Sequence, residues 1–140
     1  SGRNINEKYP RDILNLFLKS LSLRKVKKIL MLGVSYKANC NDIRNSKSID
    51  ILERLKSKKL SVEIFDPFFK NFDQKNLKKF KLLKSLPLNK KYDAIIISVD
   101  HDYFKKLNAS TLKNMCKEDL AIFDIKNIFP KEGFFRLWKI

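Results

Sequence analysis

Two basic side chains and a carboxylate lie in a polar stretch, "LGVSYKANCNDIRNSK", that could hold an anion. Lys37 and Arg44 are seven positions apart, with Asp42 between them. An ammonium group is a compact charge that suits phosphate, whereas a guanidinium offers a planar fork for phosphate or carboxylate. Asp42 can orient Arg44 through a salt bridge. These residue types leave two interpretations open, a phosphate-binding loop or a solvated loop whose charges pair with each other.

The elements on either side of this stretch must position it. A nearly continuous apolar run at 28–34 is typical of a strand buried on both faces. Apolar spacing then predicts a helix at 46–58, which Asn45 or Ser46 can cap. Unbonded N–H groups at the start of that helix favour an anion. The order strand, loop and helix therefore places the polar stretch where a ligand could bind.

Further apolar runs continue an alternation of strands and helices. A strand, a helix and a second strand predict a parallel pair with a right-handed crossover, and hence an α/β fold with helices on the faces of a parallel sheet. Residues 68–91 are interpreted as irregular chain with a short helix or strand near 75–84, and residues 128–140 as an aromatic tail. The other predicted elements are a helix at 10–21, strands at 61–67, 94–99 and 120–125, and short helices at 101–107 and 109–116.

The formal net charge of +16 over 140 residues is compatible with a polyanionic partner such as nucleic acid. Only six of the 31 basic residues are arginine, and the lysines are spread through every segment. Dedicated nucleic-acid binders concentrate arginine and interleave exposed aromatic side chains. A solvated, lysine-rich surface is therefore favoured, and a basic nucleic-acid-binding α/β module is kept as the alternative.

The sequence lacks the motifs of several common binding and catalytic sites. Its three glycines make neither a GxGxxG dinucleotide fingerprint nor a P-loop. One histidine and two cysteines do not predict a metal site. His101 follows a strand but has no nucleophile motif, so a structural role is favoured, and Cys40 has basic neighbours without a base. With no signal-peptide pattern and no apolar run of ~18 residues, we expect a cytoplasmic protein without a membrane partner.

Longer motifs resemble the C-terminal domain of the UDP-glucose/GDP-mannose dehydrogenase family. In that family a strand ending in LG precedes K-x-[ND]-x-x-D-x-R-x-S, a helix and a strand ending in DP. "YDAIIISVDHDYF" and "IFDIKNIFP" resemble two later family motifs, and "NCNDIRNS" is most similar to members acting on UDP-N-acetylhexosamines. The first motif is matched by Lys37, Asn39, Asp42, Arg44 and Ser46.

The resemblance implies a Rossmann-like three-layer sandwich with a mostly parallel sheet flanked by helices. Residues 1–22 would be the end of a central connecting helix, and residues 23–140 the C-terminal UDP-binding domain. Lys37 and Lys126 would bind the substrate, although many members carry arginine where this chain has Lys126. The other implied roles are an approach to NAD by Arg44 and support of the site by Asn39, Asp42 and Ser46.

The resemblance also implies an activity for the whole enzyme. Family members oxidise C6 of a nucleotide sugar from alcohol to carboxylate in two steps, for surface polysaccharide precursors, with NAD on an N-terminal domain. They use a catalytic cysteine in a G-G-x-C motif that is missing here, so we expect no catalytic residue, no metal and no activity from this chain alone. Expected partners are the UDP-sugar, the NAD-binding domain and a second copy in a full-length homodimer, without nucleic acid. A degenerate domain that only completes an oligomer is a further alternative.

Overall fold

Six strands and three complete helices make up the described part of the chain. The computed structural model describes residues 15–20, 26–44, 46–71, 77–89, 92–117, 121–129 and 137–139. The strands are β1 (Lys28–Leu32), β2 (Ser61–Phe65), β3 (Lys81–Leu82), β4 (Ala94–Ile97), β5 (Ile122–Asp124) and β6 (Leu137–Lys139). The helices are α2 (Lys47–Ser57), α3 (Asp102–Lys105) and α4 (Ala109–Asn114), and residues 15–20 are also helical.

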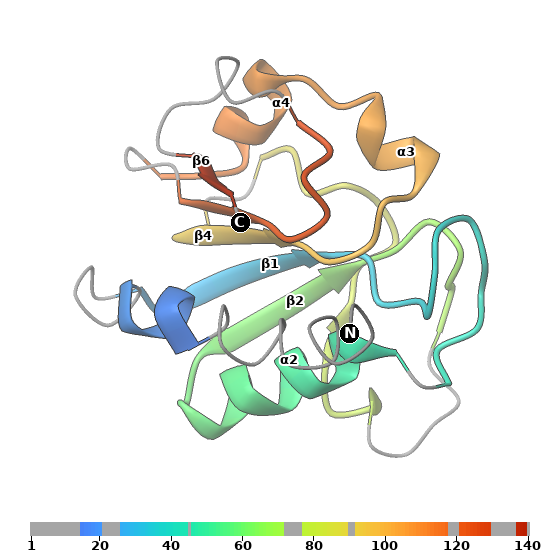
Figure 1. Ribbon diagram of the computed structural model, residues 1–140, viewed down its shortest axis with the longest axis horizontal. Helices are drawn as coiled ribbons and strands as arrows, with labels where there is room; N and C mark the ends of the chain where they lie inside the picture. Colours follow the sequence, from blue (N-terminus) through green and yellow to red (C-terminus); the bar gives the residue numbers. More distant parts are fainter. Residues whose placement is uncertain are drawn as a thin grey trace, which may run out of the picture.

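The six strands form one sheet in the order β3-β2-β1-β4-β5-β6, and every pairing is parallel. The chain winds outward from β1 in one direction and from β4 in the other. Figure 1 shows β1, β2 and β4 side by side with their arrowheads at a common edge. In such sheets ligands bind beyond the carboxyl ends of the strands, where the winding direction reverses. That point lies between β1 and β4.

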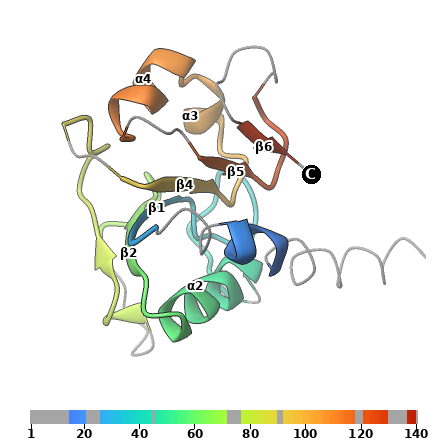
Figure 2. The ribbon, with the colours of Figure 1, turned by 90° about the vertical axis from the view of Figure 1, so that its left-hand side faces the viewer.

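The central strands are buried because both faces of the sheet are covered. Every residue from Ile29 to Leu32, and every residue of β4, is fully buried. Ile29 and Met31 pack with Phe17 and with the apolar side of α2, whereas Leu30 and Leu32 pack on the opposite face with residues from α3 and α4. Figure 2 shows the resulting three layers, with α3 and α4 on one side and α2 with residues 15–20 on the other. The predicted α/β sandwich is confirmed.

The long apolar runs predicted their elements well, whereas one of the two short strands was expected only as a short helix or strand and the other was missed. The four predicted strands and the helix at 46–58 are present with slightly narrower bounds, and both short helices are found. The segment expected to hold a short helix or strand near 75–84 contains β3, which has two residues. The interpretation of 128–140 as an aromatic tail included no strand, but Leu137–Lys139 pairs with β5 as β6.

Parts of the predicted organisation cannot be compared with the structure. Of the first predicted helix, residues 15–20 are described, and residues 10–14 and 21 lie outside the described residues. The proposed boundary between residues 22 and 23 also lies outside them, so the division into two parts stays a prediction. Asn45, the alternative cap, is outside as well. None of the described helices has the length and apolarity needed to cross a membrane.

Candidate functional site

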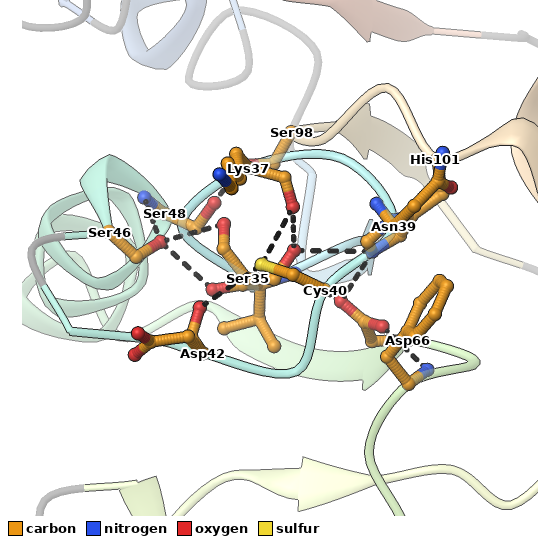
Figure 3. Close-up of polar contacts among 12 residues, drawn as sticks. Ser35, Lys37, Asn39, Cys40, Asp42, Ser46, Ser48, Asp66, Ser98 and His101 are labelled. Atoms are coloured by element: carbon orange, nitrogen blue, oxygen red, sulfur yellow. Dashed lines mark hydrogen bonds and ion pairs between the residues drawn. The ribbon is translucent and has the colours of Figure 1, made fainter.

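The loops that follow β1, β2 and β4 meet at the carboxyl edge of the sheet. We call residues 33–44, which follow β1, the site loop. Figure 3 shows its side chains converging with Asp66 from the end of β2 and with Ser98 and His101 from the segment after β4. Three segments far apart in sequence thus form one polar cluster at the position expected for a ligand site in this topology.

A glycine allows the chain to leave β1 for the site loop. Gly33 has a φ of +93°, in the left-handed region that side chains rarely adopt. A Cβ atom on Gly33 would lie 2.7 Å from Cβ of Val99, in the segment after β4. The Gly33 N–H donates to the Phe65 carbonyl oxygen at 2.9 Å, which ties the start of the loop to the end of β2. Close approach of two segments therefore requires glycine here.

The site loop is closed by its own hydrogen bonds. The Tyr36 N–H donates to the Asp42 carbonyl oxygen at 2.6 Å, and Ser35 Oγ donates to the Lys37 carbonyl oxygen at 2.7 Å. Ser46 caps α2, because its Oγ accepts from the Ser48 N–H at 3.1 Å. The same Oγ donates to the Val34 carbonyl oxygen at 2.8 Å. Ser46 thereby joins the helix start to the beginning of the loop.

The predicted salt bridge between Asp42 and Arg44 is present. Arg44 Nη2 lies 2.9 Å from Asp42 Oδ2, Arg44 Nε lies 3.1 Å from Oδ1, and the Arg44 backbone N–H donates to Oδ1 at 2.9 Å. Hydrogen bonds from the Arg44 side chain are the main reason that the pKa of Asp42 falls to about 2. The Arg44 side chain is nevertheless 84% exposed. Asp42 therefore orients the guanidinium while leaving it open to solvent.

Lys37 differs from Arg44 in having no carboxylate partner among the residues that the structure describes. It is exposed on the site loop, and within the described part of the chain its amino group makes no salt bridge. An exposed cation whose charge is not compensated nearby is available for an anionic group of a ligand. Among the described residues the loop thus contains one basic side chain in a salt bridge and one without, and phosphate binding by the loop stays a prediction.

His101 connects the three segments. Its Nδ1 lies 2.8 Å from the backbone nitrogen of Asn39, and its Nε2 lies 3.0 Å from Asp66 Oδ2 and 3.3 Å from Ser35 Oγ. The ring is fully buried, which agrees with the structural role favoured from sequence. Asn39 has a φ of +59°, and its Oδ1 accepts from the Asp102 N–H at 3.0 Å. Asn39 therefore links the site loop to the start of α3.

Sequence reasoning did not single out Asp66 as a site residue. Its Oδ2 accepts from the Val34 N–H at 2.8 Å and its Oδ1 from the Phe68 N–H at 2.9 Å, and the side chain is buried. A carboxylate at the end of a buried strand, directly before a proline, is a signal that could have pointed to it. Ser48 and Ser98 were also missed, and their hydroxyl groups hydrogen-bond between α2 and the segment after β4.

Lys126 lies exposed in the turn after β5, at the same edge of the sheet. Asp124 holds this turn, because its carboxylate accepts from the N–H groups of Ile128 and Phe129, each at 3.1 Å. Asn127 completes the turn with a φ of +55°. Among the described residues no hydrogen bond or ion pair joins Lys126 to the site loop. Its role in ligand binding therefore stays a prediction.

Cys40 is half-buried in the site loop, and its Sγ donates to the Lys37 carbonyl oxygen at 3.2 Å. That contact involves no basic side chain of the kind that would activate a thiol. The described residues also contain no group of three or more histidine, cysteine, aspartate or glutamate side chains that could hold a metal ion.

The strand order, with polar loops at the switch point, defines a Rossmann-like α/β domain. The chain belongs to the UDP-glucose/GDP-mannose dehydrogenase family, whose UDP binding domain matches residues 30–131. The matched residues include the whole site loop, Asp66, His101 and Lys126. The resemblance seen in the motifs is therefore confirmed.

Curated relatives align with nearly all of this chain but extend well beyond it. It is 26% identical over 137 residues to UDP-N-acetyl-D-glucosamine 6-dehydrogenase of Pseudomonas aeruginosa, an alignment with 94% of this chain and 32% of the relative. It is 31% identical over 150 residues to Protein CapL of Staphylococcus aureus, covering all of this chain and 34% of that protein. The chain thus spans about a third of the length of these curated relatives.

A solved structure agrees with these alignments. The UDP-N-acetyl-mannosamine dehydrogenase Cap5O from Staphylococcus aureus superimposes with a TM-score of 0.74 at 27% identity, over 99% of this chain and 31% of that one. Several of the relatives are dehydrogenases of UDP-N-acetylhexosamines, the members to which "NCNDIRNS" is most similar. The homologous enzymes are UDP-sugar 6-dehydrogenases, and they match this chain through their C-terminal domain.

Proposed function

We propose that this chain binds the nucleotide part of a UDP-sugar as the C-terminal domain of an NAD-dependent UDP-sugar 6-dehydrogenase. The observation that carries the proposal is the family match, which covers a polar loop with an exposed lysine at the switch point of the sheet. In the whole enzyme the C6 alcohol would be oxidised to a carboxylate in two steps, for surface polysaccharide precursors. NAD would supply the hydride acceptor for both steps.

Each basic residue at the carboxyl edge has a separate role in this proposal. Lys37 reaches the nucleotide sugar, and its exposed, unpaired ammonium group suits a phosphate-bearing ligand. Arg44 approaches the NAD held by the N-terminal domain, and Asp42 orients its guanidinium while leaving it exposed. Lys126 approaches the nucleotide as a point charge, without the two-pronged contact that arginine makes. Asn39, Asp42 and Ser46 hold the loop in shape.

The proposal assigns the missing functions to the rest of the enzyme. An N-terminal domain would bind NAD, and the G-G-x-C cysteine would come from a part of the enzyme outside this chain. Residues 1–22 would be the end of the helix that leads into this domain. The chain alone would therefore bind UDP weakly and have no dehydrogenase activity. The full-length enzyme would be a cytoplasmic homodimer.

The test is an amide chemical-shift titration of the 140-residue chain with UDP, with ATP and a short DNA duplex as controls. We expect shifts confined to the site loop, Lys126 and their neighbours, and stronger with UDP. Lys37→Ala should abolish most of the response. The matched control is Lys113→Ala, which removes an exposed lysine of α4 far from the site loop. Cys116, three residues after Lys113, pairs with Tyr92 just before β4 begins, which places this region at the other end of the strands.

The net charge of +16 gives the nucleic-acid-binding alternative its only support. Under that alternative the DNA duplex would cause diffuse shifts that decrease steeply with salt, because phosphate contacts release counterions. Such shifts, together with no response to UDP, would overturn the proposed function. No response to any of the three ligands would favour the domain that only completes an oligomer.

A further inference from the structure

We propose that His101 is a positioning residue, which as a neutral imidazole protonated at Nε2 holds the backbone around Lys37 in its ligand-binding geometry. The ligand in this inference is UDP, so the part that concerns binding rests on the proposed function. The part that concerns the ring and the site loop is inferred from the contacts of His101 and does not depend on any ligand.

The hydrogen-bond partners determine which nitrogen of the ring carries the proton. The Asn39 backbone N–H can only donate, so Nδ1, at 2.8 Å, must accept with its lone pair. The Asp66 carboxylate can only accept, so Nε2, at 3.0 Å from Oδ2, must carry the hydrogen. An imidazolium has no acceptor and would lose the bond from Asn39. The geometry therefore requires the neutral Nε2–H tautomer.

The surroundings of the ring make these bonds costly to lose. His101 is fully buried between two aromatic rings, with centroids 4.8 Å away at Phe68 and 5.3 Å away at Phe104. Asp66 is also fully enclosed and already accepts the backbone N–H groups of Val34 and Phe68. A polar group that loses its partner in such an enclosure cannot regain one from water. The ring is therefore a fixed connection between the loops.

The contacts of His101 lie on both sides of Lys37 in the chain. Asn39 follows Lys37 by two residues and is held through its backbone. Ser35 precedes it by two residues, lies 3.3 Å from Nε2, and donates its own hydroxyl hydrogen to the Lys37 carbonyl oxygen. Because the ring is buried, it acts through the loop and does not itself contact the ligand. Holding the loop before binding reduces the entropy lost when the ligand binds.

The mutational test compares two replacements of the ring in the 140-residue chain. Glutamine in His101→Gln keeps a neutral donor and acceptor, whereas leucine in His101→Leu fills space without either. We expect His101→Leu to weaken UDP binding about tenfold and to speed hydrogen exchange at the Asn39 amide. We expect His101→Gln to recover most of both. Unchanged UDP affinity and exchange in His101→Leu, with the fold intact by circular dichroism, would overturn the positioning role.

A double-mutant cycle with Lys37→Ala separates positioning from general damage to the domain. If His101 acts by placing Lys37, His101→Leu should cost little further affinity once Lys37 is gone. Full additivity of the two losses would contradict the proposal. No UDP binding by the unchanged chain would overturn the proposed function, whereas UDP binding that tolerates His101→Leu would overturn the positioning role alone.

The ring also gives a direct spectroscopic signature, because the chain has one histidine. Long-range ¹H–¹⁵N spectra of the chain should show a single ring protonated at Nε2 and unprotonated at Nδ1 at neutral pH. A ring protonated at Nδ1, or at both nitrogens, would overturn the inference whatever the chain binds.

Discussion

At the scale of single residues, the site loop separates two kinds of cation. Arg44 is held by Asp42 in a two-pronged pair, and Lys37 is left unpaired among the described residues. Exposed ion pairs of this kind contribute little to stability, because solvent and salt screen them. The Asp42–Arg44 pair is therefore better understood as fixing the direction of the guanidinium than as holding the fold together.

The pKa of Asp42 tests this pair. Its value in the folded chain is about 2, below the ordinary 3.8, because Arg44 donates hydrogen bonds to the ionised carboxylate. A lowered pKa means that the stabilisation is present above about pH 3.8 and is lost as pH falls toward 2. Arg44→Ala should return the value toward 3.8, measured by carboxyl chemical shifts. A value still near 2 in Arg44→Ala would show that another group lowers it.

Lys126 allows a second prediction at this scale. Arginine offers a two-pronged contact to phosphate that lysine cannot make, so Lys126→Arg should keep or strengthen UDP binding. Lys126→Ala should weaken it about tenfold, as expected for loss of a charge-assisted hydrogen bond. Calorimetric titration of the three chains measures both effects. Equal affinities in all three would remove Lys126 from the site.

At the scale of elements, α2 is joined to the site loop through its N-cap residue. Ser46 Oγ serves the helix through the Ser48 N–H and the loop through the Val34 carbonyl oxygen. Ser46→Ala should lower the free energy of unfolding by about 1–2 kcal/mol. Ser57→Ala is the matched control at the exposed end of the same helix, where a change within about 0.5 kcal/mol is expected. Urea denaturation measures the free energy of unfolding of both variants. Equal losses in Ser46→Ala and Ser57→Ala would contradict the capping role.

The elements differ in how well the sequence predicts them. The runs that became β1, β4 and β5 are apolar because helices cover both faces of the sheet, and β2 alternates apolar and polar residues, so the local pattern was sufficient. β3 and β6 have two and three residues, too few for a period, and they depend on pairing with β2 and β5. Local pattern cannot predict a strand that exists because of its neighbour.

The same distinction applies to the site. Lys37, Asn39, Asp42, Arg44 and Ser46 share one motif, and their local hydrogen bonds follow from short spacing. The hub formed by His101 and Asp66 joins residues 35 to 66 positions apart. Such contacts become visible only when the strand order places their loops together. The sequence therefore predicted the local contact between Asp42 and Arg44 but not the long-range contacts that hold the loop.

At the scale of the whole molecule, the amino ends and the carboxyl ends of the strands have different roles. At the edge away from the site loop, Tyr92 Oη donates to the buried Glu63 carboxylate at 2.5 Å, and Lys28 and Lys81 lie 3.6 and 3.7 Å from Glu63 Oε2. Burial, together with this bond to a carboxylate, raises the pKa of Tyr92. This cluster joins the beginnings of the strands, so we assign it to stability.

Tyr92→Phe tests that division. Removing the hydroxyl deprives buried Glu63 of this hydrogen bond, so the free energy of unfolding should fall by about 1–3 kcal/mol. UDP affinity should not change, because the cluster lies at the other end of the strands. Tyr36→Phe is the matched control on the exposed site loop, with an expected change in stability within about 0.5 kcal/mol. A loss of UDP affinity in Tyr92→Phe would contradict the assignment of stability to one end of the strands and ligand binding to the other.

The shortness of the two outermost strands has a consequence for handling the molecule. β3 has two residues and β6 has three, and Lys81 in β3 keeps a largely exposed side chain. Long, flat, apolar edges recruit strands from other chains, whereas short or lysine-bearing edges discourage such growth. The sheet therefore offers little template for fibre formation, and the chain should remain dispersed at the high concentrations that spectroscopy requires.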